Sequence, residues 1–403
     1  MGDRGPLDGV RVVELGNFIA APTAGRLLAD FGADVIKVER PGTGDELRRW
    51  RLHGGDTSLL FRTLGRNKRS ITLDLRQPAG QEIARRLITR GDVLLENFRP
   101  GTLERWGLGP DQLHELNPDL VVVRVSGYGQ TGPYRDRPGF GGVAEAIGGL
   151  RALTGYPDLP PTRVGVSLAD SVAGLYAVIG ALLGLARRER AAGPSGEVVD
   201  VALYEAVYSL MESLIPDFDA FEVVRGPAGS ALPGVAPSNT YRCADDKYIV
   251  ISGNGNAIYQ RLMRAIGRSD LAADPALADN TGRVAHADLL DQAIGAWTAT
   301  MTQEAAEADL LAVGVPSGPI LTAEDIVKDP HFQARGMIDR RRVRIDGDHT
   351  TEVAFPGIVP TLTRRPGRTR SLGPELGEHT EAVLAELDID INTHAKLREQ
   401  GVI

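Results

Sequence analysis

The sequence contains very few groups that bind metals or form disulfides. Its 403 residues include one cysteine, Cys243, which excludes an internal disulfide and a cysteine-based zinc site. A single thiol is typical of a small buried side chain in a reducing cytoplasm. The 7 histidines are scattered, and no two have metal-ligand spacing on a common helix. We therefore expect no metal centre.

Long hydrophobic runs are also missing. The longest apolar stretch, Ala177–Ala186, contains two glycines and is too short to span a bilayer. The first ten residues, MGDRGPLDGV, lack the apolar region of a signal peptide. A net charge of −8 argues against a nucleic-acid surface. We therefore expect a cytoplasmic protein that binds neither membranes nor nucleic acids.

The composition and the strand and helix patterns indicate an α/β protein. The 48 glycines and 25 prolines indicate many tight loops. Strand patterns alternate with helix patterns, which predicts a doubly wound, mostly parallel sheet of Rossmann-like type. The loop at 16–22 lacks the Gly-x-Gly-x-x-Gly spacing, so no dinucleotide cofactor is expected. The six strands are expected at 10–15, 34–38, 70–75, 93–96, 120–126 and 197–203.

Composition divides the chain into three parts. Residues 1–220 are expected to form the large domain with the parallel sheet. Residues 224–239 are rich in Gly, Pro, Ser and Ala and resemble a linker, so 221–328 is predicted as a small α/β domain. Residues 329–403 begin with a loop-rich segment and end in two helices. We expect this last part to return to the large domain or to pack on a partner subunit.

A long helix pattern begins near Asp170 and ends at a group of arginines. Bulky apolar residues recur at three- and four-residue steps, so one face of this helix should be buried. That face comprises Val172, Leu175, Tyr176, Ile179, Leu182, Leu183 and Ala186. Arg187 and Arg188 suit the carboxyl end of the helix, where positive charge is favoured.

Asp170 lies in the first turn of this helix and has two interpretations. The amide groups and dipole of a helix start favour the charged form of a carboxylate, so we expect Asp170 to stay ionised. An ionised carboxylate can attack an activated acyl carbon as a nucleophile. Alternatively, Ser167 and Asp170 form a capping box, and the acid has only a structural role.

Basic residues follow several of the expected strands. Arg40 follows the second strand, Arg76 the third, and Arg99 and Arg105 the fourth. Ligands bind at the carboxyl ends of the strands in an α/β sheet. Arginines collected there suit a polyphosphate ligand, although each could equally be a solvated surface charge.

Several longer motifs follow one another along the chain. They are LDGV at 7–10, FGADVIKVERP at 31–41, NKRS at 67–70, LDL at 73–75, ENFRPG at 96–101, SGYGQTGPY at 126–134, LAD at 168–170 and GEHT at 377–380. In this order they resemble the signatures of class III CoA-transferases, the CaiB/BaiF family, which includes formyl-CoA transferases. Asp170 occupies the position of that family's catalytic aspartate, so the resemblance implies a nucleophile.

The resemblance implies a transfer of CoA from an acyl-CoA to a free carboxylic acid, through an aspartyl anhydride and an aspartyl-CoA thioester. No cofactor would be bound permanently, and the subunits would form an interlocked homodimer. The glycine turn Gly253-Asn254-Gly255 would stabilise the oxyanions through its backbone N–H groups. The implied CoA-binding residues are Ile19, Ala20, Arg40, Leu73, Asp74, Leu75, Arg76, Asn97, Phe98 and Arg105.

Two other functions remain open. The α-methylacyl-CoA racemases of the same family carry a proton-transferring histidine where this chain has Phe140, which disfavours racemisation. A CoA-binding protein without turnover is the second alternative, disfavoured by the intact Asp170. Arg137 stands near the position of a lysine in formyl-CoA transferases. It is a candidate contact for a carboxylate, which favours a dicarboxylic acid such as succinate.

Overall fold

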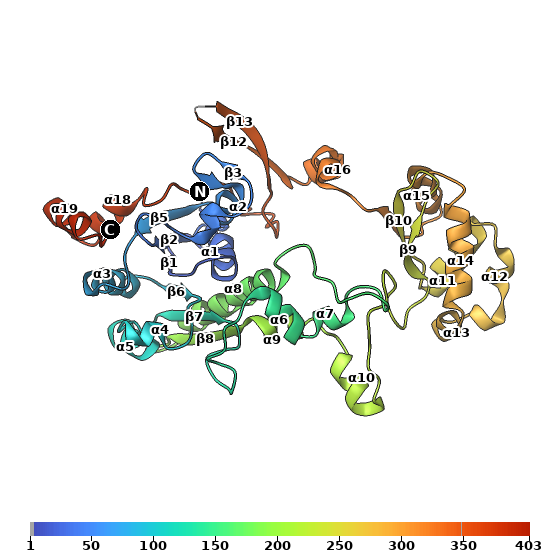
Figure 1. Cartoon of the computed structure of the whole chain (residues 1–403), viewed down its shortest axis with the longest axis horizontal. Coiled ribbons are helices and arrows are strands. Elements are labelled where there is room, and N and C mark those ends of the chain that lie inside the picture. The colour runs from blue at the N-terminus through green and yellow to red at the C-terminus, as the bar shows by residue number, and fades with distance from the viewer. Residues whose placement is uncertain (1–3, 348) are drawn as a thin grey trace. The chain divides into compact units, whose positions relative to one another are not determined.

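The computed structural model describes residues 4–347 and 349–403, and the chain divides into two compact units (Figure 1). The large unit comprises Met1–Leu150, Arg163–Val223 and His331–Ile403. The small unit comprises Arg151–Thr162 and Val224–Pro330. The chain therefore leaves the large unit twice and returns to it twice.

A six-stranded sheet with the order β5-β2-β1-β6-β7-β8 forms the centre of the large unit. Each pair of neighbouring strands is parallel, which confirms the mostly parallel sheet predicted from the alternating pattern. Val12 of β1 is paired with Val35 on one side and with Val93 on the other. The strands are β1 (Arg11–Glu14), β2 (Asp34–Glu39), β5 (Lys68–Thr72), β6 (Val93–Glu96), β7 (Val121–Ser126) and β8 (Glu197–Ala202).

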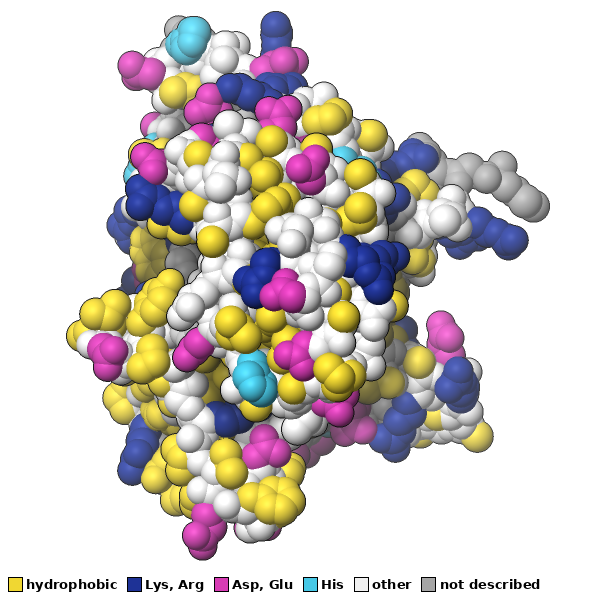
Figure 2. Space-filling view, turned by 90° about the vertical axis from the view of Figure 1, so that its right-hand side faces the viewer, with side chains coloured by type: hydrophobic (Ala, Val, Ile, Leu, Met, Phe, Trp, Pro, Cys, Tyr) yellow, Lys and Arg dark blue, Asp and Glu magenta, His cyan; other side chains and the backbone are white. Residues whose placement is uncertain are grey.

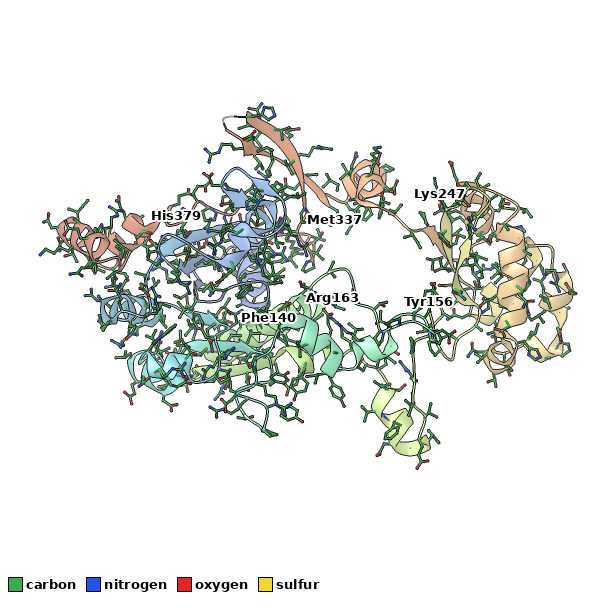
Figure 3. All side chains as sticks on the ribbon, viewed as in Figure 1. Phe140, Tyr156, Arg163, Lys247, Met337 and His379 are labelled. Atoms are coloured by element: carbon green, nitrogen blue, oxygen red, sulfur yellow. The ribbon has the colours of Figure 1, made fainter. Side chains whose placement is uncertain are left out.

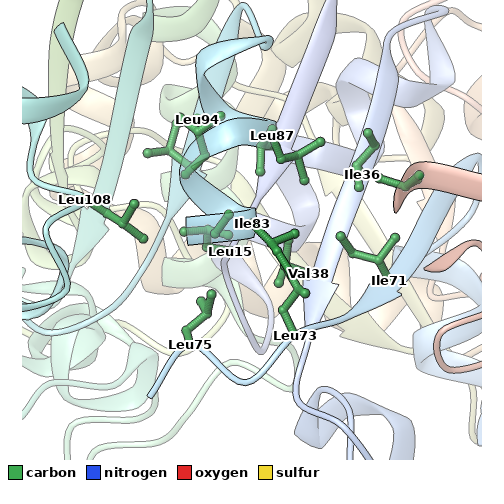
Figure 4. Close-up of a cluster of buried hydrophobic side chains, with 14 of the residues drawn as sticks. Leu15, Ile36, Val38, Ile71, Leu73, Leu75, Ile83, Leu87, Leu94 and Leu108 are labelled. Carbon is green, nitrogen blue, oxygen red and sulfur yellow. The ribbon is translucent and has the colours of Figure 1, made fainter. Parts of the chain in front are cut away.

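Helices cover both faces of this sheet, so most residues of the four central strands are buried. All six residues of β7 are buried. On one face, side chains of the strands pack with α3 and with the last two helices of the chain in a single hydrophobic cluster (Figure 4). The helices of this face are α3 (Pro78–Thr89), α4 (Thr102–Arg105), α5 (Pro110–Leu116), α18 (Thr380–Glu386) and α19 (Ile391–Glu399).

The other face is covered by α1 (Ala20–Asp30) and α8 (Leu168–Arg188). The buried face of α8 consists of small residues, and Leu185 is its one large member. A Cβ added at Gly174 would lie 2.9 Å from the Ala20 carbonyl oxygen of α1, and one at Gly184 would lie 2.8 Å from Val121. The helix therefore approaches α1 and the sheet too closely for larger side chains. By length and composition α8 could cross a membrane, a test that core helices also pass.

The prediction for α8 was wrong about which face is buried within the chain. The bulky residues Leu175, Tyr176, Ile179, Leu182 and Leu183 are between 38% and 66% exposed. Their periodicity correctly indicated an apolar stripe. The alanines and glycines of α8 pack closely on α1 and the sheet, so the stripe of bulky residues faces away from the sheet.

The rest of the large unit is made of short elements and a hairpin. The segment after 329, predicted as loop-rich, contains the antiparallel pair β12 (Ile338–Asp346) and β13 (His349–Pro356). The others are η1 (Glu46–Arg49), β3 (His53–Gly54), β4 (Thr57–Ser58), α2 (Leu59–Leu64), α6 (Gly141–Ile147), α9 (Leu203–Tyr208) and α10 (Leu214–Phe221). Two short helices, α7 (Leu150–Leu153) and α17 (Pro330–Ala334), lie where the chain passes between the units.

The small unit has its own core on an antiparallel sheet with the order β11-β10-β9. Cys243 is buried in that core, as expected for a lone thiol. The strands are β9 (Ser238–Arg242), β10 (Tyr248–Ser252) and β11 (Ser317–Pro319). The helices are α11 (Asn256–Ala265), α12 (Ser269–Ala273), η2 (Pro275–Leu277), α13 (Asn280–Ala285), α14 (Ala287–Thr298), α15 (Gln303–Ala312) and α16 (Ala323–Lys328).

Candidate active site

The direction of winding changes between β1 and β6, which are neighbours at the centre of the sheet. In doubly wound sheets the loops after two such strands diverge and leave a crevice, where ligands bind. Here Asn17 follows β1 and Asn97 follows β6. The Asn97 side chain accepts a hydrogen bond from the Asn17 N–H (2.8 Å) and donates one to the Asn17 carbonyl (2.7 Å). The two loops are thus held in register.

Buried ion pairs stabilise the loop that follows β1. The Lys37 Nζ donates to the Gly16 carbonyl oxygen (2.7 Å) and lies 2.9 Å from Glu14 Oε1 and 2.8 Å from Asp45 Oδ2. Asp45 in turn accepts a hydrogen bond from the backbone N–H of Phe18 (3.1 Å). Phe18 has a left-handed backbone, with φ of 62°, which is uncommon for an aromatic residue. This network fixes an otherwise unfavourable loop conformation at the crevice.

A cavity of about 340 Å³ opens at the carboxyl ends of β1, β2, β5 and β6. Its wall combines arginines, carboxylates and apolar side chains. The arginines suit anionic groups of a ligand, and the apolar side chains suit a flat apolar group. The Phe98 and Trp106 rings meet edge to face, 5.1 Å apart. Six of the predicted CoA-binding residues line it, namely Arg40, Leu73, Asp74, Leu75, Arg76 and Phe98.

A second cavity, of about 290 Å³, shares Asn17, Phe98 and Arg99 with the first. Asp170 lies in its wall together with Arg99, Arg135 and Arg137. Ala20, Asn97 and Phe140 also line it. The shared residues make the two cavities parts of one groove, so the predicted nucleophile lies near the predicted CoA-binding residues.

Asp170 is held against the backbone of α6. A Cβ placed on Gly141, the first residue of α6, would lie only 2.1 Å from Asp170 Oδ2. Glycine is therefore needed at this position for the carboxylate to occupy its place. Ser167, the residue before α8, makes no side-chain hydrogen bond to the first turn of the helix, so the capping-box interpretation of Asp170 is wrong.

The expected effect of the helix start on the pKa of Asp170 is also corrected. Burial and the charge of Glu145 together raise the pKa of this carboxyl to about 6, and the charge of Arg163 opposes them. The helix start does not compensate for the loss of water. With this pKa the ionised form of Asp170 still predominates at pH 7, and a carboxylate of higher pKa is a more basic oxygen nucleophile.

Some predicted residues lie outside both cavities. Ile19 is buried beside Leu47 and Phe61, where it supports the loop that carries Phe18. Arg105 lies in α4 and donates to the hydroxyl of Thr102 (3.0 Å), a residue that lines the first cavity.

Gly253, Asn254 and Gly255 belong to the small unit, in the turn between β10 and α11. The Gly253 N–H donates to the Pro237 carbonyl (2.9 Å), and the Asn254 carbonyl accepts from Arg283 (2.7 Å). In this conformation the Gly253 N–H is engaged within the small unit. The oxyanion role of the turn stays a prediction.

Several functional candidates had no clear signal in the sequence. Glu145 and Arg163 lie 25 and 7 residues before Asp170. The packing of α6 against α8 brings the charge of Glu145 to Asp170, and the segment before α8 brings that of Arg163. The ring of Phe18 meets Phe140 edge to face at 5.8 Å. Among the described residues, no group of three or more His, Cys, Asp and Glu side chains is placed to hold a metal ion.

Comparison with known proteins adds independent information. Residues 7–380 match the model of CoA-transferase family III. The chain is 48% identical over 383 residues to the succinyl-CoA–D-citramalate CoA-transferase of Chloroflexus aurantiacus, covering 95% of this chain and 94% of that one. It is 35% identical to the succinate–glutarate CoA-transferase of Agrobacterium fabrum, with 95% and 96% covered. A CaiB/BaiF family protein of Brucella suis has a similar structure, with a TM-score of 0.83, 34% identity, and 96% and 100% covered.

Proposed function

The chain belongs to CoA-transferase family III and is a CoA-transferase, and from that premise we propose that it exchanges CoA between dicarboxylic acids with Asp170 as the nucleophile. The observation that carries this proposal is the cavity that places Asp170 together with Arg99, Arg135 and Arg137. A dicarboxylate attached to CoA at one end has a free carboxylate at the other, which a guanidinium binds well. The similar enzymes from two bacteria act on succinyl, citramalate and glutarate groups by name, which supports this substrate class.

The proposed reaction proceeds through two covalent states of Asp170. Its carboxylate oxygen attacks the thioester carbonyl carbon, the carbon–sulfur bond breaks, and CoA leaves as the thiolate. The thiolate then attacks the Asp170 carbonyl carbon of the anhydride, which releases the donor acid and leaves an aspartyl-CoA thioester. The acceptor carboxylate repeats these steps in reverse. No proton is transferred to or from carbon, so the route needs position and charge stabilisation rather than an acid–base pair.

We propose that the first cavity holds the nucleotide end of CoA. Arg40, Arg76 and Arg99 provide positive charge for its phosphates, while Phe98 and Trp106 provide aromatic surface. Arg76 is held by Asp74, with distances of 2.8 and 2.9 Å, so its guanidinium is oriented before the ligand arrives. Binding here leaves the thioester end of CoA free to extend into the cavity of Asp170.

We propose that Arg137 is one contact for the distal carboxylate. Its guanidinium stacks on the ring of Tyr134, 3.5 Å from the ring centre, which limits its mobility. The racemase alternative has no support at this site. Phe140, which takes the place of the racemase histidine, lines the cavity with an aromatic ring that carries no transferable proton.

We also propose that the protein is a homodimer, interlocked as in its family. The exposed apolar stripe of α8 supports this, because contiguous hydrophobic surface on a soluble enzyme usually marks an interface. Helix α10 adds Ile215, Phe218 and Phe221, which are 47–77% exposed. Figure 2 shows further hydrophobic side chains among charged ones on the face of the molecule that it draws. A second copy of the chain is the occupant that we propose for this surface.

The experiment that tests the function measures CoA exchange by mass spectrometry, with succinyl-CoA as donor. Dicarboxylic acids such as glutarate and citramalate are compared with monocarboxylic acids of matched length. We expect the dicarboxylic acids to accept CoA at least about tenfold faster, in keeping with one charge-assisted contact. Equal rates for both kinds of acid would contradict the proposed substrate class, and no exchange with any acid would contradict the proposed activity.

A further inference from the structure

Glu145 is a buried carboxylate beside the nucleophile. It lies in α6 with 0% of its surface exposed. It follows Gly141 by four residues, which places both on the same side of the helix, one turn apart. Gly141 contacts the Asp170 carboxylate, and the charge of Glu145 acts on Asp170 and raises its pKa. Two carboxylates thus share a poorly hydrated region, where like charges repel more strongly than in water.

Arg163 is the cation that balances this pair. Its Nε lies 3.6 Å from Glu145 Oε2, and its side chain is 52% exposed. Arg163 is labelled in Figure 3. Arg163 also acts on Asp170 and lowers its pKa, in opposition to Glu145. The segment that carries Arg163 leads into α8 five residues later, so the cation is held close to the start of the helix.

Other elements around Asp170 contribute little opposing charge. α1 faces α8 with uncharged Ala20 and Thr23. On α9, Glu205 accepts a hydrogen bond from the hydroxyl of the neighbouring Tyr204 (3.0 Å), and neither group contributes to the shift at Asp170. The remaining charges are the arginines of the cavity wall, Arg99, Arg135 and Arg137. Among the described residues, Glu145 is therefore the acid whose charge raises the pKa of Asp170.

The negative charge of Asp170 is present only in the free enzyme. In the anhydride and in the aspartyl-CoA thioester, the carboxylate oxygen or carbon is bonded to its partner and carries no net charge. Repulsion from Glu145 therefore raises the free energy of the free carboxylate and leaves the covalent states unaffected. Such a difference favours formation of the covalent states.

We propose that Glu145 is a positioning residue that destabilises the free Asp170 carboxylate relative to its acylated forms, and that Arg163 limits this repulsion so that Asp170 remains ionised at neutral pH. This inference rests on the covalent route proposed above. It differs from a structural role for the pair, because removal of the Glu145 charge should lower the pKa of Asp170, whereas removal of the Arg163 charge should raise it.

The test uses the full-length protein with Glu145→Gln and Arg163→Met, and Glu205→Gln on α9 as the matched control. The acid limb of kcat/KM reports the ionisation of the free enzyme. We expect a limb near pH 6 in the wild type, a shift of at least about one pH unit downward in Glu145→Gln, and an upward shift in Arg163→Met. The control should keep the wild-type limb.

A second readout is the fraction of enzyme that carries a covalent group when acyl-CoA is supplied without acceptor. We expect the ratio of covalent to free enzyme to fall about tenfold in Glu145→Gln, because a decrease of one unit in the pKa of Asp170 corresponds to a tenfold change in an equilibrium constant. Limbs that do not move, or that move in the same direction in both variants, overturn the inference. Arg163→Met keeps the test decisive if Glu145→Gln does not fold, because Arg163 is half exposed. Absence of any covalent group in the wild type would instead refute the proposed function.

Discussion

Replacing Gly141 with alanine should displace the nucleophile without unfolding the protein. The new Cβ would lie 2.1 Å from Asp170 Oδ2 and 2.9 Å from its Cγ, whereas ordinary contacts begin near 3.4 Å. The carboxylate must therefore move by more than about 1 Å, and misplacement of that size costs roughly a hundredfold in rate. Alanine favours the helix at this position, so the free energy of unfolding should change by less than about 1 kcal/mol.

The assay is CoA exchange at saturating substrate, together with thermal unfolding. We expect kcat to fall about a hundredfold, while KM for the acyl-CoA changes little because the nucleotide end binds in the other cavity. Gly165→Ala is the matched control, since a Cβ at that position has no atom within 4 Å. A folded Gly141→Ala protein with near-normal kcat would refute the assignment of Asp170 to the reacting position.

Three further changes test separate parts of the account. Asp170→Asn should stabilise the fold at pH 7 by about 1–3 kcal/mol. The reason is that the folded-state pKa of Asp170 is raised to about 6, so the wild type loses stability as the pH rises from about 4 to 6. Urea unfolding of the wild type at both ends of that range measures this loss. Arg76→Ala should raise KM for acyl-CoA about tenfold with kcat unchanged, whereas an unchanged KM would remove Arg76 from the CoA site. Ile179→Arg, on the exposed stripe of α8, should hinder assembly of the proposed dimer during folding, so that monomers appear in mass photometry of refolded protein, whereas complete assembly would remove this stripe from the interface.

Much of the site followed from local patterns combined with parallel geometry. Strand and helix patterns alternate, so the strands run in one direction and their carboxyl ends meet at one edge. Arg40, Arg76 and Phe98 follow different strands and do line one cavity. Because each residue immediately follows its strand, small errors in the strand ends did not change the edge at which it lies.

The face of α8 that packs on the sheet could not be predicted from periodicity alone. The pattern shows which residues share a face but not what covers it. Gly180 illustrates this, since a Cβ there would lie 2.3 Å from Val199 of β8. Small residues are weak in a hydrophobic pattern, yet they allow the closest packing.

The raised pKa of Asp170 also could not be predicted from the sequence. Its position at a helix start suggested a lowered pKa, but burial and Glu145 raise it. Burial depends on the tertiary packing of α6, and Glu145 is distant along the chain. The arginine-rich strand β12 was missed for a related reason: its exposure alternates, but Arg341 takes one of the inner positions, so the sequence lacks the apolar–polar alternation of a half-buried strand.

Trapping the covalent enzyme tests the central claim most directly. The protein is mixed with acyl-CoA in the absence of an acceptor acid, quenched with hydroxylamine, digested and mapped by mass spectrometry. A nucleophilic Asp170 predicts a hydroxamate on the peptide that contains it, formed within one turnover and absent from Asp170→Asn. Sustained CoA exchange by Asp170→Asn that is free of deamidation, or a hydroxamate at another residue, would contradict the account.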